Sequence, residues 1–149
     1  MAIRWDKLTL KAQEAVQRAN DIASQHGNPE LLPVHLLAAL LEDREGIVLP
    51  TLARIGANAQ AIEGEAQRAI ERLPKVSGGA MQASLSPAAN RVIEQAFKEA
   101  DNFKDEYVST EHLLLAIADA RGDAAHQMLT HEGADHDAIL KALISVRGS

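Results

Sequence analysis

Hydrophobic residues recur along most of the chain at the spacing of an α-helix. Residues 12–23 and 89–100 carry Ala, Val, Ile and Phe at three- and four-residue steps, with polar residues between them. This spacing predicts two amphipathic helices, each with one buried face. Residues 34–41 and 112–118 are apolar almost all round, which predicts helices at the centre of the fold. No run alternates with period two, so the pattern predicts an all-α protein.

The second half of the chain repeats the first at an offset of 77 residues. Residues 9–72 align without a gap with residues 86–149, and thirteen of the 64 pairs are identical. Chance would give roughly five in so Ala- and Leu-rich a chain. The motif His35-Leu36-Leu37-x-Ala39 matches His112-Leu113-Leu114-x-Ala116. We therefore interpret the chain as two copies of one four-helix unit.

Turn and capping residues support the same division. Ser86-Pro87 places a hydroxyl acceptor at an N-cap and a proline at the first helical position. Gly56 and Gly133 each follow a predicted third helix, where a left-handed residue ends helices well. Asn58 and Asp135 come two residues later and are good caps for a fourth helix.

The segment between the two copies is rich in helix breakers and lacks apolar periodicity. We predict repeat one at 9–72, a linker at 73–85 and repeat two at 86–149, within a single domain covering 1–149. A 64-residue unit alone would bury only about 60% of its surface. The two units should therefore pack together as one pseudo-twofold, eight-helix bundle.

Amino-acid composition excludes several classes of function. The 149 residues include 15 Lys and Arg against 21 Asp and Glu, without a basic stripe, so we expect no nucleic-acid partner. The absence of cysteine excludes disulfides, thiolate metal sites and a cysteine nucleophile, and is typical of the cytoplasm. The N-terminus has no signal-peptide pattern, and the longest apolar run, 31–41, is shorter than the roughly 20 residues of a membrane span.

Motifs for catalysis and metal binding are absent from the sequence. It contains no phosphate-binding loop, GxSxG, HExxH or EF-hand pattern, so we expect no enzymatic activity and no cofactor. His35 and His112 occupy equivalent positions, which favours structural rings bonded near a helix start. His126, His131 and His136 fall on different helix faces, which favours solvated surface over a metal site. A helical enzyme or metal binder built on these groups is the weakest alternative, and metal content of the purified protein would test it.

The segment before the second apolar helix is unusual. Asp105-Glu106 followed by Glu111 would suit acid–base chemistry only if buried together, and capping or surface charge explains these acids equally well. Tyr107-Val108 stands in a connection rather than on a periodic helix face. The pair either plugs the junction between the copies or lines an exposed apolar groove, and both roles are compatible.

Together these motifs resemble a known family. The first copy has a T-x-x-A-x-x-A…HLL-x-AL…L-x-x-x-G pattern, which the second repeats with Ser86, Val92 and Ile117 as its three changes. The linker reads Arg-Leu-Pro-Lys-Val-x-Gly over 72–78, and the chain closes on Val146-Arg147-Gly148. This resembles the tandem Clp-N repeat that begins members of the Clp family of AAA+ ring chaperones. The linker is similar to that of the ClpB branch rather than the ClpA or ClpC branches, and the likeness covers essentially the whole chain.

The resemblance implies a Clp N-domain fold and a module that recruits unfolded or aggregated polypeptide to a hexameric, ATP-driven disaggregase of the heat-shock response. In that family ATP, Mg²⁺ and ring assembly belong to ATPase modules, so for this domain alone the resemblance implies no catalysis, no cofactor and a monomer. We expect no membrane partner. The alternative is docking of one adaptor protein, as in ClpA- and ClpC-type unfoldases.

The resemblance also implies a site. In the family, polypeptide contacts a groove between the repeats, flanked by a threonine that begins the first helix and by the two acids of a D-x-[FY]-[IV]-S-x-E stretch. That stretch is residues 105–111 here. We expect an apolar groove with an acidic rim, because apolar contacts tolerate many sequences. The expected site residues are Thr9, Leu10, Leu85, Asp105, Tyr107, Val108 and Glu111.

Overall fold

The computed structural model describes residues 3–76 and 82–148, and these form eight α-helices. The all-α prediction is therefore confirmed, as is the eight-helix arrangement. Part of the predicted linker, residues 77–81, lies outside the described residues. The helices are α1 (Leu10–Gln25), α2 (Pro33–Glu42), α3 (Val48–Ile55), α4 (Ala59–Glu71), α5 (Pro87–Asn102), α6 (Thr110–Asp119), α7 (Ala124–His131) and α8 (His136–Val146).

The two halves match helix by helix. Shifting α1 and α2 by 77 residues reproduces the bounds of α5 and α6. The predicted caps are present: the side chains of Ser86, Asn58 and Asp135 each accept a hydrogen bond from a backbone N–H three residues later. Gly56 and Gly133 have φ of 87° and 79°, the left-handed conformation in which glycine ends a helix without strain.

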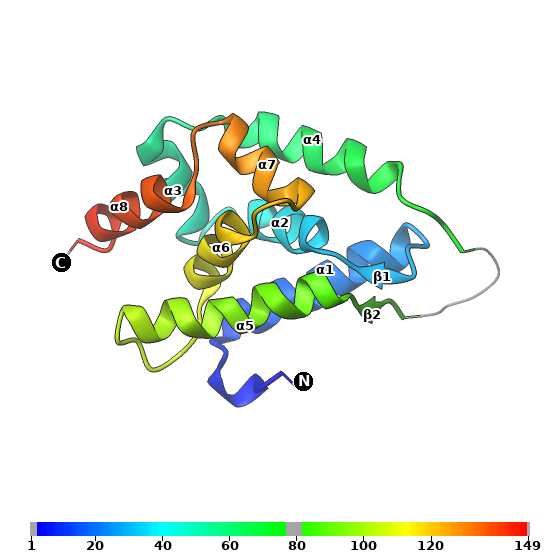
Figure 1. The fold of residues 1–149 in the computed structure, drawn as a ribbon, viewed down its shortest axis with the longest axis horizontal. Helices are drawn as coiled ribbons and strands as arrows, with labels where there is room; N and C mark the ends of the chain where they lie inside the picture. The colour runs from blue at the N-terminus through cyan, green and yellow to red at the C-terminus, as the bar shows by residue number, and fades with distance from the viewer. Residues whose placement is uncertain (1–2, 77–81, 149) are drawn as a thin grey trace.

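The two repeats interlock instead of standing side by side. Helix α3 of the first repeat packs against α8 of the second, and α7 of the second packs against α4 of the first (Figure 1). In each repeat the first two helices pack closely together, α1 with α2 and α5 with α6. Helices α2 and α6 also contact each other, so the core is continuous through both repeats.

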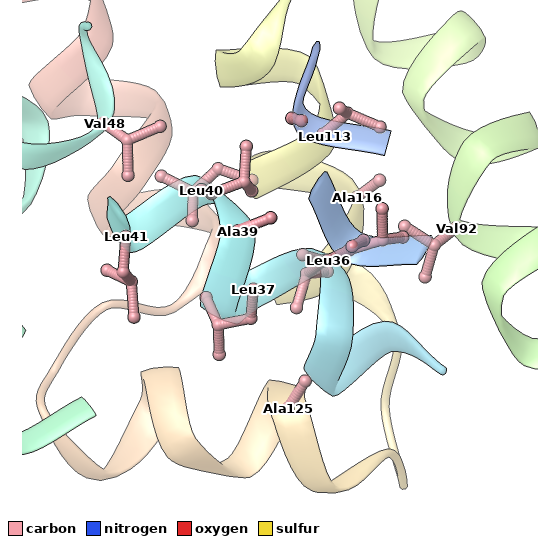
Figure 2. Close-up of a cluster of buried hydrophobic side chains, with 14 of the residues drawn as sticks. Leu36, Leu37, Ala39, Leu40, Leu41, Val48, Val92, Leu113, Ala116 and Ala125 are labelled. Carbon is pink, nitrogen blue, oxygen red and sulfur yellow. The ribbon is translucent and has the colours of Figure 1, made fainter. Parts of the chain in front are cut away.

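The core is centred on α2 and α6, as their apolar sequences predict. Residues 33–41 and 110–118 are buried throughout. Figure 2 shows leucines of both helices, among them Leu36, Leu40 and Leu113, packed together, with Val92 of α5 and Ala125 of α7 beside them. Among the described residues, none of the helices combines the length and apolar character of a membrane span.

Two short parallel backbone connections join the repeats. Strand β1 (Glu30–Leu31) pairs with β2 (Ser84–Leu85), and an equivalent bridge joins Leu8 to Val108. The 77-residue offset converts one connection into the other. Each links the segment just before α1 or α5 to the segment before the central helix of the other repeat. The sequence did not predict them, because two-residue strands are too short to show periodicity.

The buried centre predicts a large effect of cavity formation in α6. Replacing Leu113, which is 0% exposed, by Ala should lower the free energy of unfolding by about 2–5 kcal/mol. Leu10→Ala, at a side chain that is 73% exposed, is the matched control and should change it by less than about 0.5 kcal/mol. Urea unfolding monitored by circular dichroism measures both, and equal effects would show that α6 is not the centre of the core.

Candidate functional site

Exposed apolar side chains gather near the start of α1. Of the five large hydrophobic side chains that are exposed among the described residues, three are Trp5, Leu10 and Tyr107, at 42%, 73% and 46%. Trp5 and Leu10 flank the bridge residue Leu8, and Tyr107 precedes its partner Val108. The bridge therefore brings together apolar side chains that lie about a hundred residues apart in sequence. We call Lys7, Thr9, Leu10, Glu106 and Tyr107 the Tyr107 surface.

The neighbouring residues Tyr107 and Val108 have opposite environments. The Val108 side chain is 2% exposed and belongs to the core. Its backbone N–H donates to Lys7 O (2.8 Å), and its carbonyl accepts from Thr9 N–H (2.9 Å). Val108 thus closes the junction between the repeats. We expected its side chain to line an exposed groove, but the side chain is buried. Tyr107 is the one that faces solvent.

Thr9 has a capping role as well as a place on the surface. Its Oγ1 accepts a hydrogen bond from Ala12 N–H (3.1 Å) and donates to Ser109 Oγ (3.4 Å). The second bond ties the start of α1 to the residue that precedes α6. Leu10, the first residue of α1, is left pointing into solvent. Thr9 is therefore tied to the segment that carries Tyr107, and Leu10 follows it as an exposed residue at the start of α1.

Charged groups surround the Tyr107 ring. The Lys7 Nζ lies 5.7 Å from the ring centroid, a cation–π contact. A hydrogen bond to Glu106, with added repulsion from the carboxylates of Glu106 and Asp6, raises the pKa of the Tyr107 phenol. The hydroxyl therefore stays protonated at neutral pH and remains a hydrogen-bond donor.

Leu85 lies apart from the Tyr107 surface, contrary to our expectation of one groove. It is half-buried in β2 and lines a separate hollow of about 260 Å³, together with Ile3, Trp5, Val16 and Leu31. We call this the Leu85 hollow. Residues 3–10 connect it to the Tyr107 surface, since Trp5 lines the hollow and Lys7 contacts the tyrosine ring.

Asp105 is held by two protein groups. Arg147 donates from Nη1 to Oδ2 (3.0 Å) and from Nη2 to Oδ1 (2.9 Å), and His112 Nε2 donates to Oδ2 (2.8 Å). The guanidinium also lies 4.7 Å from the centroid of the Phe103 ring. The Arg147 hydrogen bonds, supported by the His112 bond and the guanidinium charge, hold the pKa of Asp105 below its ordinary value. Asp105 is therefore a carboxylate with its oxygens already occupied.

Glu111, like Asp105, does not supply a freely exposed carboxylate to the rim of the expected groove. It lies in the first turn of α6 and is 9% exposed, at the position where the first repeat has the apolar Val34. The N-terminal end of a helix carries partial positive charge, which stabilises a carboxylate there. Asp105 and Glu111 thus precede and follow the Tyr107 segment closely in sequence, but both are less exposed than we expected.

The two paired histidines have the structural role that we predicted. His35 Nδ1 accepts from Leu32 N–H (2.9 Å), and its Nε2 donates to Asn28 Oδ1 (2.9 Å). In the second repeat, His112 Nδ1 accepts from Ser109 N–H (2.8 Å), and its Nε2 donates to Asp105. Burial, with a smaller contribution from His26, lowers the pKa of His35 to about 4.

The other histidines form no metal centre. Within residues 3–76 and 82–148, no group of three or more His, Cys, Asp or Glu is arranged to hold a metal ion. The expectation of solvated rings was wrong for two of them. His126 Nδ1 lies 2.7 Å from Ala118 O, and His136 Nε2 lies 2.8 Å from a carboxylate oxygen of the buried Glu99. Both rings connect neighbouring helices.

Arg147 and Lys7 are the site residues that sequence reasoning missed. Arg147 lies 42 residues from Asp105, and its only sequence signal was its place in the closing Val146-Arg147-Gly148. Lys7 precedes the first helix and carried no signal. Both contacts depend on how the repeats pack, which no local pattern reveals.

Known proteins share this fold and sequence. Residues 7–132 match the Clp repeat (R) N-terminal domain family. The chain is 43% identical over 141 residues to the chaperone protein ClpB of Mycobacterium leprae and 44% identical over 145 residues to that of Corynebacterium glutamicum. Each match covers 95% of this chain and 16% of the relative, so the chain spans about a sixth of their length.

A solved structure gives the same result. The Hsp104 N-terminal domain from Candida albicans superposes with a TM-score of 0.83 and 26% sequence identity, over 96% of this chain and 93% of that one. The predicted Clp N-domain fold and the predicted similarity to the ClpB branch are both confirmed.

The His35 environment predicts acid sensitivity. Its folded pKa of about 4 lies below the unfolded value of 6.5, so only the unfolded chain binds this proton between those limits. The stability contribution is complete above pH 6.5 and is lost as the pH falls towards 4. The slope should reach about 1.4 kcal/mol per pH unit. Urea unfolding across this range measures it.

His35→Gln should lower stability at pH 7 and remove this part of the pH dependence. His131→Gln, at a side chain that is 65% exposed, is the control and should leave the slope unchanged. An unchanged slope in His35→Gln would show that another group is responsible.

Proposed function

The chain belongs to the family of Clp repeat N-terminal domains, and from this premise we propose that it binds unfolded or aggregated polypeptide for an ATP-driven disaggregase of the ClpB type. The observation that carries the proposal is the exposure of Leu10 and Tyr107 next to the backbone bridge that joins Leu8 to Val108. Apolar side chains held in solvent by a rigid scaffold are available for a partner.

The chemistry of the surface suits a substrate without a fixed sequence. Leucine and tyrosine make apolar contacts with many side chains, and the Tyr107 hydroxyl, which donates to Glu106, can still accept from a backbone N–H. The carboxylate of Glu106 can accept from backbone N–H groups or from basic side chains. Such contacts give weak binding, micromolar or poorer, since no part of the site is fitted to one partner.

The Leu85 hollow extends the same surface. Its apolar lining comes from Val16 and Leu31 of the first repeat and from Leu85 of the linker, and it begins at Trp5, on the segment that leads to Leu10. An extended chain that crosses residues 3–10 would meet the hollow first and the tyrosine second. We include both in the polypeptide-binding site, together with Thr9, and we assign the more enclosed Asp105 and Glu111 to its support.

The proposal includes the setting of this module. We propose that it is carried in the cytoplasm by a homohexameric ring whose ATPase modules bind ATP and Mg²⁺, while the N-domain itself is monomeric and non-catalytic. Several tethered copies acting on one aggregate would raise the apparent affinity by a factor of about 10²–10⁴. Weak single sites are then sufficient for capture.

A titration tests polypeptide binding directly. A short fluorescein-labelled peptide of leucine, arginine and serine is added to the 149-residue chain, and amide shifts are followed by NMR. The resonances of residues 5–10 and 106–109 should move. Unchanged resonances there at millimolar peptide would contradict the proposal.

A pull-down from lysate separates this function from adaptor docking. Polypeptide capture predicts a heterogeneous mixture of proteins that diminishes when unfolded competitor is added. A single stoichiometric folded partner, unaffected by the competitor, would instead select an adaptor-docking domain.

Truncation of the exposed tyrosine should weaken binding without unfolding the chain. Tyr107→Ala should raise the Kd for the labelled peptide roughly tenfold, since aromatic anchors dominate such surfaces. Fluorescence anisotropy measures the Kd. Ile144→Ala is the matched control, because Ile144 is 59% exposed on α8 and lies outside the proposed site.

Val108→Ala should behave differently, lowering stability because its side chain is buried. If Tyr107→Ala unfolds the chain, or if Ile144→Ala weakens peptide binding equally, the exposed tyrosine is not the anchor.

A further inference from the structure

Position 105 has a counterpart in the first repeat that is remote from the Tyr107 surface. The 77-residue offset relates Asp105 to Asn28 and His112 to His35. The two pairs make the same bond, from the histidine Nε2 to a side-chain oxygen, at 2.9 Å in the first repeat and 2.8 Å in the second. Holding the histidine ring is therefore a task that this position performs in both repeats.

The same position also fastens the chain that leaves the last helix of its repeat. In the first repeat, Asn28 Nδ2 donates to Pro74 O (3.2 Å), just after α4. In the second repeat, Asp105 accepts both guanidinium bonds of Arg147, just after α8. Asn28 and Asp105 thus link a histidine to a helix end in equivalent places.

These contacts leave little of Asp105 for a ligand. One carboxylate oxygen accepts from Arg147, and the other accepts from both Arg147 and His112. The side chain is 22% exposed. A peptide could bond to Asp105 only in competition with charge-assisted bonds that are already formed.

The backbone conformation of Lys104, the residue before Asp105, is a second reason to expect that this segment is anchored. Lys104 has φ of 60°, a left-handed conformation that is unfavourable for lysine, whereas its counterpart Gly27 adopts φ of 69° without strain. A strained residue persists only where its surroundings hold it. The Asp105 contacts hold the segment directly after it, which leads to Tyr107.

We propose that Arg147 is a positioning residue of the polypeptide-binding site: it fixes Asp105, and through it the segment 105–108 that displays Tyr107, while Asp105 itself does not contact substrate. This inference rests on the proposed function. It assigns a role to the end of α8, and it replaces substrate contact by an architectural role for one acid of the site.

A double-mutant cycle tests this assignment. Arg147→Ala and Asp105→Asn should each raise the Kd for the labelled peptide by roughly three- to tenfold, as expected for partners in one hydrogen-bond network. Asp105→Asn keeps an oxygen for His112, as Asn28 does for His35. The double variant should bind no more weakly than Arg147→Ala alone, because both substitutions remove the same anchor.

Arg18→Ala is the matched control for loss of an ion pair. Arg18 also makes a two-point contact with a carboxylate, that of Glu42 (2.6 and 3.2 Å), but away from the Tyr107 surface. Its removal should leave the Kd unchanged.

Hydrogen exchange distinguishes positioning from general loss of stability. Arg147→Ala should accelerate exchange of the Val108 and Thr9 amides, which close the bridge beside Tyr107. The equivalent bridge amide of Ser86, bonded to Leu31 O, serves as the internal control and should stay protected. Arg147→Lys, which keeps the charge but not the two-point contact, should give an intermediate result. Equal acceleration of both bridges would overturn the proposal.

The failures are distinguishable. If the unmodified chain does not bind the peptide, the proposed function fails. If the unmodified chain binds the peptide and Arg147→Ala binds it with the same Kd, Arg147 does not position the site. If Asp105→Asn weakens binding further in the Arg147→Ala background, Asp105 contacts substrate and the assignment is wrong.

Discussion

The structure depends on satisfying the first backbone N–H groups of two helices that are buried on every side. Helices α2 and α6 have no exposed face from which water could reach their starts, and an unpaired buried N–H is costly. A histidine in the first turn of each helix meets this constraint, since its Nδ1 accepts the N–H of Leu32 or Ser109. The accepting nitrogen must be unprotonated, so the ring carries its proton on Nε2 and needs an acceptor there.

The need for a hydrogen-bond acceptor at each histidine Nε2 explains the position of the candidate site. Asn28 and Asp105 supply the acceptors from loops seven residues before each histidine, so both loops are held against the core. The same loops pair with the segments before α5 and α1. In the first repeat Glu30 occupies the outward position of the bridge, and in the second repeat this position is Tyr107. A duplicated scaffold therefore carries an aromatic side chain in only one of its two equivalent places.

The sequence predicted the features that depend on neighbours along the chain. Helical periodicity and caps such as Ser86 and Asn58 act over three or four residues, and the internal repeat revealed the pseudo-twofold arrangement. Pairings over longer separations escaped prediction. The burial of Val108 follows from its bridge to Leu8, and the anchoring of Asp105 follows from Arg147 beyond the end of α8. Leu85 lines a hollow separate from the Tyr107 surface because the two bridges are equivalent in pattern and distinct in space.

The packing of helices of one repeat on helices of the other has a mechanical consequence. Because α8 packs on α3 and α7 packs on α4, tension applied at the C-terminal end passes directly into the first repeat. Neither half can be peeled away while the other keeps its core. The two repeats should therefore unfold together, as one cooperative unit.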